Sequence, residues 1–80
     1  MNDVERELIG CFAATFPNRS EEEIRTATRD SFAEWDSLAA ITLLSLIQQE
    51  FQIDVDLTDL DELGSFAAVL QYVEVRLEPV

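Results

Sequence analysis

The most informative segment of the chain is residues 36–51, DSLAAITLLSLIQQEF. Its apolar residues recur at three- and four-residue steps and so form one face of an amphipathic α-helix: Leu43, Leu44, Ile47 and Phe51, with Leu46 beside them. We predict a helix from Ser37 to Phe51 as the central element of the fold. Asp36 or Ser37 is its N-cap, because a short polar side chain can accept a hydrogen bond from a free N–H of the first turn.

The two ends of the chain show the same helical spacing. The N-terminal helix is capped by Asn2 or Asp3, ends before Pro17, and has an apolar stripe made of Val4, Leu8, Cys11, Phe12 and Phe16. The C-terminal helix is capped by Ser65, precedes Pro79, and has a stripe made of Phe66, Val69, Leu70, Val73 and Leu77. Three main helices are therefore predicted.

The connection over residues 17–36 is long and polar. Ser20 and Glu23 have the spacing of a capping box, so we expect a loop with a short helical turn. Ile24 is an isolated apolar anchor, and we expect Phe32 and Trp35 to hold the loop against the core.

The second connection begins with apolar and acidic residues in alternation over residues 53–57. A single short strand has no partner elsewhere in the sequence, so an extended loop is predicted there. Residues 58–63 are expected to form one helical turn that places Leu60 and Leu63 inward and ends at Gly64. The predicted fold class is all-α: one domain over residues 1–80, with three main helices, one short helix and a long first loop.

The composition excludes several classes of function. Seventeen acidic residues against five basic ones give a net charge of −12, which disfavours nucleic acid and membrane insertion and favours partners with basic patches. The chain has one cysteine, Cys11, no signal-peptide pattern and no apolar run of about 18 residues. We expect a cytoplasmic monomer in which Cys11 serves as a small core residue.

Ser37 stands out among the polar residues because it opens the central helix. The chain has no histidine and no lysine, so it cannot build a Ser-His or Ser-Lys pair, and no catalytic residue is predicted. If Ser37 reacts, another protein supplies the chemistry. The start of a helix, with its free N–H groups and positive dipole end, favours a phosphate ester on that serine.

A calcium loop is the other candidate site. Asp54, Asp56 and Thr58 occupy the first, third and fifth positions of an EF-hand loop. The sixth position is Asp59 where glycine is needed, and the twelfth is Ser65 where a bidentate glutamate is needed. A solvated acidic loop is the favoured interpretation, and no metal site is predicted.

At these residues the chain resembles an acyl carrier protein, a family that includes carriers of fatty acid, polyketide and nonribosomal peptide synthesis. The resemblance covers nearly the whole chain and rests on Asp36-Ser37-Leu38, residues 50–55 (EFQIDV), Ser31-Phe32 and Ser65-Phe66. It implies that a magnesium-dependent phosphopantetheinyl transferase attaches 4′-phosphopantetheine from coenzyme A to Ser37, and that the arm's thiol then holds cargo as a thioester. It also implies that the transferase reads Asp36, and that loading and acyl-transferring enzymes dock at Leu38, Ile41 and Glu50.

The chain departs from the family pattern in its charge distribution. Thr42, Gln48 and Gln49 stand where acids are expected, and the acids cluster in the second connection. Because charges at the rim of an interface set association rate and partner choice, this pattern suggests a specialised lipid, polyketide or peptide pathway. An acyl cargo and an aminoacyl cargo both remain open, as does the alternative of a non-covalent acidic adaptor for a basic protein.

Overall fold

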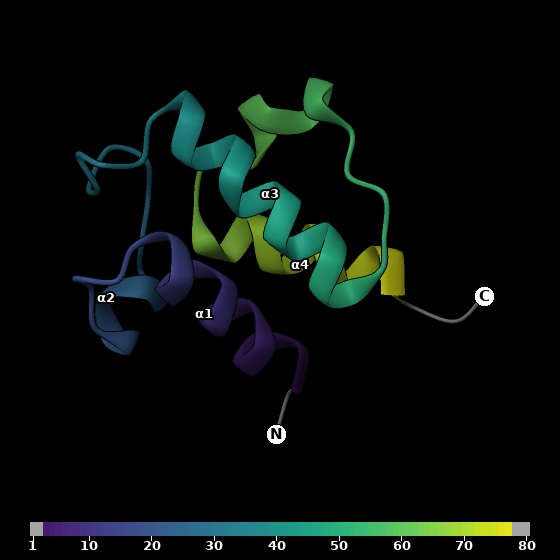
Figure 1. Ribbon diagram of the computed structural model, residues 1–80, viewed down its shortest axis with the longest axis horizontal. Helices are drawn as coiled ribbons and strands as arrows, with labels where there is room; N and C mark the ends of the chain where they lie inside the picture. The colour runs from purple at the N-terminus through teal and green to yellow at the C-terminus, as the bar shows by residue number, and fades with distance from the viewer. Residues whose placement is uncertain (1–2, 78–80) are drawn as a thin grey trace.

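The computed structural model describes residues 3–77, apart from the side chain of Leu57, and shows an all-α fold (Figure 1). The main helices are α1 (Asp3–Thr15), α3 (Ser37–Phe51) and α4 (Phe66–Leu77). Two short segments join them: α2 (Glu21–Arg25) and the 3₁₀-helix η1 (Leu57–Glu62). The predicted fold class is confirmed, and the helical turn expected in the first connection is α2.

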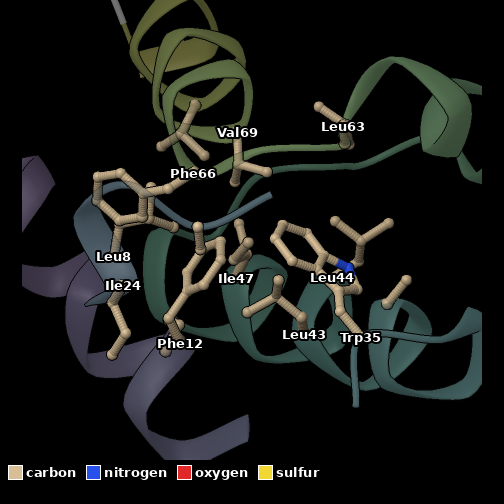
Figure 2. Packing of buried hydrophobic residues seen from close by; sticks show 14 of the residues in the cluster. Leu8, Phe12, Ile24, Trp35, Leu43, Leu44, Ile47, Leu63, Phe66 and Val69 are labelled. Atoms are coloured by element: carbon tan, nitrogen blue, oxygen red, sulfur yellow. The ribbon is translucent and has the colours of Figure 1, made fainter. Parts of the chain in front are cut away.

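The core forms where the apolar faces of the main helices meet. α1 packs most extensively on α3, with Phe12 beside Ile47 and Leu43, and α4 closes the core with its own buried residues (Figure 2). The buried residues of α4 are Phe66, Val69 and Val73. Burial of one such side chain is worth about 1.5–3 kcal/mol, so the three periodic stripes supply most of the driving force for folding.

The first connection is held at three places. Ser20 and Glu23 form the predicted capping box, with the Glu23 N–H donating to Ser20 Oγ at 3.2 Å and the Ser20 N–H donating to Glu23 Oε1 at 2.9 Å. Ile24, Phe32 and Trp35 are each less than 5% exposed, which confirms them as anchors. The third is a contact between this loop and the start of α4, which the sequence did not predict.

That junction is an isolated antiparallel bridge between Thr28 and Ser65. The Arg29 N–H donates to the Gly64 carbonyl at 2.9 Å, and the Phe66 N–H donates to the Ala27 carbonyl at 3.0 Å. Two hydrogen bonds between segments so distant in sequence fix the long loop against α4. Periodicity carries no signal for such a contact, because each segment is too short to show a strand pattern.

Two local predictions about the helix ends need correction. Asp3 is the first residue of α1 and so cannot be its N-cap, while Asn2 lies outside the described residues. Leu77 was expected on the buried stripe of α4, but it is 37% exposed because the last turn of α4 extends beyond the core. Ser65 is confirmed as the cap of α4, since its Oγ accepts from the Ala68 N–H at 3.1 Å, and Pro79 lies outside the described residues.

The second connection differs slightly from its prediction. Residues 53–56 are extended, as expected, but the helical turn begins at Leu57 and is a 3₁₀-helix. Leu63 is buried and Leu60 is half-buried, so the inward placement is confirmed. Gly64 does not adopt a positive φ; among the described residues the left-handed conformation occurs at Gln52, φ 55°, which ends α3.

Gly10 provides a test of helix α1. It is exposed, lies within the helix, and a Cβ built there meets no atom within 4 Å. Glycine inside a helix is about 0.5–1 kcal/mol less favourable than alanine. We therefore expect Gly10→Ala to raise the free energy of unfolding by about that amount in urea denaturation, and an unchanged or lower value would contradict this account of α1.

Candidate functional site

Ser37 is the first residue of α3, and its side chain is exposed. The residues around it are not: Trp35, two residues earlier, is 4% exposed, and Ala40, three residues later, is 5% exposed. These two anchors face the core and leave Ser37 on the outer side of the first turn. Its hydroxyl takes part in no hydrogen bond with the described residues, so it is accessible to an external reagent.

Asp36 is the N-cap of α3, which settles the choice between Asp36 and Ser37. Its Oδ1 accepts from the Ala39 N–H at 2.8 Å, and its carbonyl accepts from the Ala40 N–H at 2.9 Å. The N–H groups of Ser37 and Leu38 have no acceptor among the residues described. A phosphate on Ser37 would find these two donors and the positive end of the helix dipole beside it.

The loop that leads to Ser37 is fixed by Arg19. Its guanidinium donates two hydrogen bonds to Glu34, from Nε to Oε2 and from Nη2 to Oε1, both at 2.9 Å, and a third to Glu23 at 3.1 Å. The same group lies over the ring of Phe32, with Cζ 4.2 Å from the ring centroid. Arg19 therefore clamps the approach to the serine, a role the sequence analysis missed because Arg19 belongs to no periodic pattern.

Trp35 holds the last step of this approach. Its ring contacts Phe12 edge-on at 5.4 Å between centroids and lies 5.7 Å from the ring of Phe16. The indole nitrogen is buried and has no hydrogen-bond partner among the described residues. An unpaired buried N–H costs about 1–3 kcal/mol, so Trp35 is the one strained feature beside the serine. The sequence placed Trp35 in the core but carried no signal for this unpaired group.

The three residues expected to dock partners do not form one patch. Leu38 is 73% exposed and Ile41 is 43% exposed, and their three-residue spacing puts them on the same side of α3. Glu50 is exposed too, but it is twelve residues from Leu38, or about 18 Å along the helix axis. It lines a groove between α1 and α3 together with Cys11, Gly10 and Leu46.

Metal binding and nucleophilic chemistry of Cys11 find little support in the described part of the chain. No group of three or more histidine, cysteine or acidic side chains over residues 3–77 could hold a metal ion. The segment considered as a calcium loop contains η1 instead. Cys11 is buried as predicted, and burial together with the charges of Glu50 and Glu7 raises the pKa of its thiol to about 11. The protonated thiol is a poor nucleophile at neutral pH.

None of the helices described is both long enough and apolar enough to cross a membrane. Ser37 is exposed at the start of α3, and the sequence contains no histidine or lysine that could act as its base.

Comparison with known families identifies the group. The family described as phosphopantetheine attachment site, PP-binding, matches residues 6–73, and the chain belongs to this family. Its domains carry covalently attached 4′-phosphopantetheine. The comparisons with curated proteins and with solved structures found no match.

The ion pair of Arg19 with Glu34 gives a prediction on pH. The hydrogen bonds from Arg19 lower the pKa of Glu34 to about 2, against an ordinary value of 4.5. The interaction that lowers the pKa of Glu34 stabilises the fold at pH values above its ordinary pKa of 4.5. This contribution is lost as the pH falls from 4.5 through 2. We expect the Glu34 carboxyl to titrate near 2 by NMR, and to return towards 4.5 in Arg19→Gln; equal midpoints in the two proteins would refute the clamp.

Proposed function

We propose that this chain is a carrier protein that bears 4′-phosphopantetheine on Ser37 and presents acyl or aminoacyl intermediates to partner enzymes. Bound there, the group supplies a flexible arm whose terminal thiol forms a thioester with the cargo. The chain itself is not an enzyme. The observation that carries the proposal is the exposed Ser37 hydroxyl at the first turn of α3, in a family defined by attachment of this group.

The residues around Ser37 fit the phosphate that attachment would place there. The N–H groups of Ser37 and Leu38 are available as donors, and the dipole of α3 favours a negative charge at its N-terminus. Asp36 holds the first turn in place as its cap. Tethering serves the pathway because a cargo held on a docked carrier meets an active site without a second diffusional encounter.

A phosphopantetheinyl transferase is the first proposed partner, and Asp36 and Leu38 are its proposed contacts. The Asp36 carboxylate is exposed next to the hydroxyl and offers a charge to read, while Leu38 and Ile41 offer apolar surface on the same turn of α3. Glu50, at the other end of the helix, would contact a different part of a large partner, such as a loading enzyme with a basic patch.

The distribution of charge on the surface bears on the pathway and the partners of the proposed carrier. Residues 37–49 of α3 carry no charge, while acids dominate the loops, so we propose partners of a specialised lipid, polyketide or peptide pathway that read this distribution. We further propose that the carrier works as a monomer in the cytoplasm. The competing function is a non-covalent acidic adaptor, which requires no modification of Ser37.

Intact mass is the direct test of attachment. Co-expression with a broad-specificity transferase should raise the mass by one phosphopantetheinyl group. Ser37→Ala should abolish the increase, whereas Ser45→Ala, which removes another exposed hydroxyl of α3, should leave it complete. Both variants should keep the helical circular dichroism spectrum. A wild-type chain that stays unmodified while a known carrier is modified would favour the adaptor.

A pair of variants separates the proposed contacts of the transferase. Asp36→Asn keeps an N-cap but removes its charge, and Leu38→Gln keeps the charge but removes exposed apolar surface. Each should slow the modification of Ser37, by about tenfold for the loss of about 1.4 kcal/mol of binding, with little change in melting temperature.

Asp36→Ala is the matched control, because it removes the cap as well as the charge and should also destabilise the fold by about 1 kcal/mol. If Asp36→Asn and Leu38→Gln are both modified at the wild-type rate, these residues are not contacts.

A further inference from the structure

Trp35 carries the one buried side-chain nitrogen or oxygen that lacks a hydrogen-bond partner among the described residues. The residue is 4% exposed, and the other buried residues described are all hydrophobic. A ligand that reached this place would therefore meet a single donor with apolar side chains around it. The indole N–H selects an acceptor oxygen attached to an otherwise apolar chain.

Packing alone does not account for an indole at this position. The rings that surround Trp35 are phenylalanines, namely Phe12, Phe16 and Phe32, and they contact one another edge-on or tilted. A phenylalanine could join the same cluster without bringing a polar group into the core. The N–H of Trp35 is thus a buried donor without a partner in the described part of the chain, and a group from outside the chain could supply the acceptor.

The position of the N–H relative to Ser37 indicates which group that is. Trp35 precedes the serine by two residues, and in Figure 2 the indole nitrogen is on the edge of the ring that faces Leu44. Ser37, Ile41 and Leu44 are spaced by four and three residues, so they follow one another on one side of α3. Ser37 and Leu44, which the donor faces, are therefore in line along α3 and are separated by seven residues, or about 10 Å along its axis, which the flexible arm has to span.

Resting on the proposed attachment to Ser37, we infer that the indole N–H of Trp35 is the hydrogen-bond donor to a carbonyl oxygen of the arm or of the thioester that joins it to cargo. Carbonyl oxygens on an aliphatic chain combine the acceptor and the apolar surface that this place requires. Trp35 acts as a positioning residue: it holds the loaded arm against the domain until a partner withdraws it. Because the indole nitrogen is buried, the apolar side chains around it must move aside to admit the carbonyl oxygen. Once formed, the hydrogen bond to that oxygen should protect the N–H from exchange with solvent.

The test uses the single tryptophan of the chain, which gives one indole N–H signal in a ¹⁵N-edited NMR spectrum. Three forms of the whole protein are compared: unmodified, carrying the arm alone, and carrying a hexanoyl arm transferred from hexanoyl coenzyme A. We expect the signal to move downfield on modification and its hydrogen exchange to slow by about tenfold or more. A change already present with the arm alone assigns an amide carbonyl as acceptor, and a change that needs the hexanoyl group assigns the thioester carbonyl.

Two results would overturn the inference. If intact mass shows the arm on Ser37 while the indole shift and exchange rate are the same in all three forms, Trp35 does not contact it. If the unmodified form shows a persistent contact between the indole N–H and a buried water that loading leaves intact, water is the partner. If the chain gains no mass at all, the proposed attachment to Ser37 is itself wrong. Intact mass therefore distinguishes a failure of the proposed function from a failure of the inference about Trp35.

Trp35→Phe provides an independent readout through stability. The variant keeps an aromatic ring and removes the donor, so the rise in melting temperature on loading should be reduced or lost, measured against the unmodified form of the same variant because the smaller ring also changes core packing. Tyr72→Phe is the matched control, because it removes a hydroxyl that donates to Asp59 at 2.9 Å on the η1–α4 side. It should lower the melting temperature of both forms and leave the rise on loading unchanged. Should Trp35→Phe fail to fold, the spectra of the wild type still decide.

Discussion

The position of Ser37 depends on one cluster of aromatic rings beneath it. Phe12 of α1 contacts Trp35 edge-on at 5.4 Å and Phe66 of α4 edge-on at 5.1 Å, while Phe16 contacts Phe32 of the loop edge-on at 5.4 Å. Such pairs add about 0.5–1.5 kcal/mol each beyond the area they bury. The cluster joins α1, α4 and the long loop at one place. Because this cluster holds Trp35 in the core, the chain leaves the core after Trp35, and Ser37 lies at the surface.

The charges of the molecule are arranged around this anchor in two ways. Arg19 is surrounded by Glu34, Glu23 and the face of Phe32, so one of the five basic residues stabilises the approach to the serine. A second arginine, Arg76, does the same for η1: it lies over the ring of Tyr72 at 3.8 Å and pairs with Asp59 at 3.7 Å. These two arginines thus stabilise the two connections between the main helices, where acids would otherwise repel one another.

These features explain how a small bundle holds Ser37 at its surface. The rigid parts, the cap by Asp36 and the buried neighbours Trp35 and Ala40, fix the serine in space. The chain has no histidine or lysine that could pair with the hydroxyl, and its one thiol is buried with a raised pKa. In the proposed function, the partner enzymes supply the chemistry.

Most of the helical structure could be predicted from local patterns. The bounds of α3, the capping box of Ser20 and Glu23, the cap of α4 at Ser65 and the inward placement of Leu63 each depend on residues within a few positions of one another. The candidate serine was found in the same way, from its place before a periodic helix and from the absence of histidine and lysine. The exposure of Leu77 could not be predicted, because periodicity gives the face of a helix but not how far the core extends along it.

What the sequence determined by itself is therefore the set of helices and some of their caps, and it singled out Ser37 as the candidate for modification. Only the tertiary structure decided that residues 27–29 pair with residues 64–66, that Arg19 reaches Glu34, and that the N–H of Trp35 finds no acceptor among the described residues. The physical reason is range. Helices and caps form through hydrogen bonds and side-chain contacts over three or four residues, whereas these other features arise when segments far apart in the chain are brought together by burial of a common core.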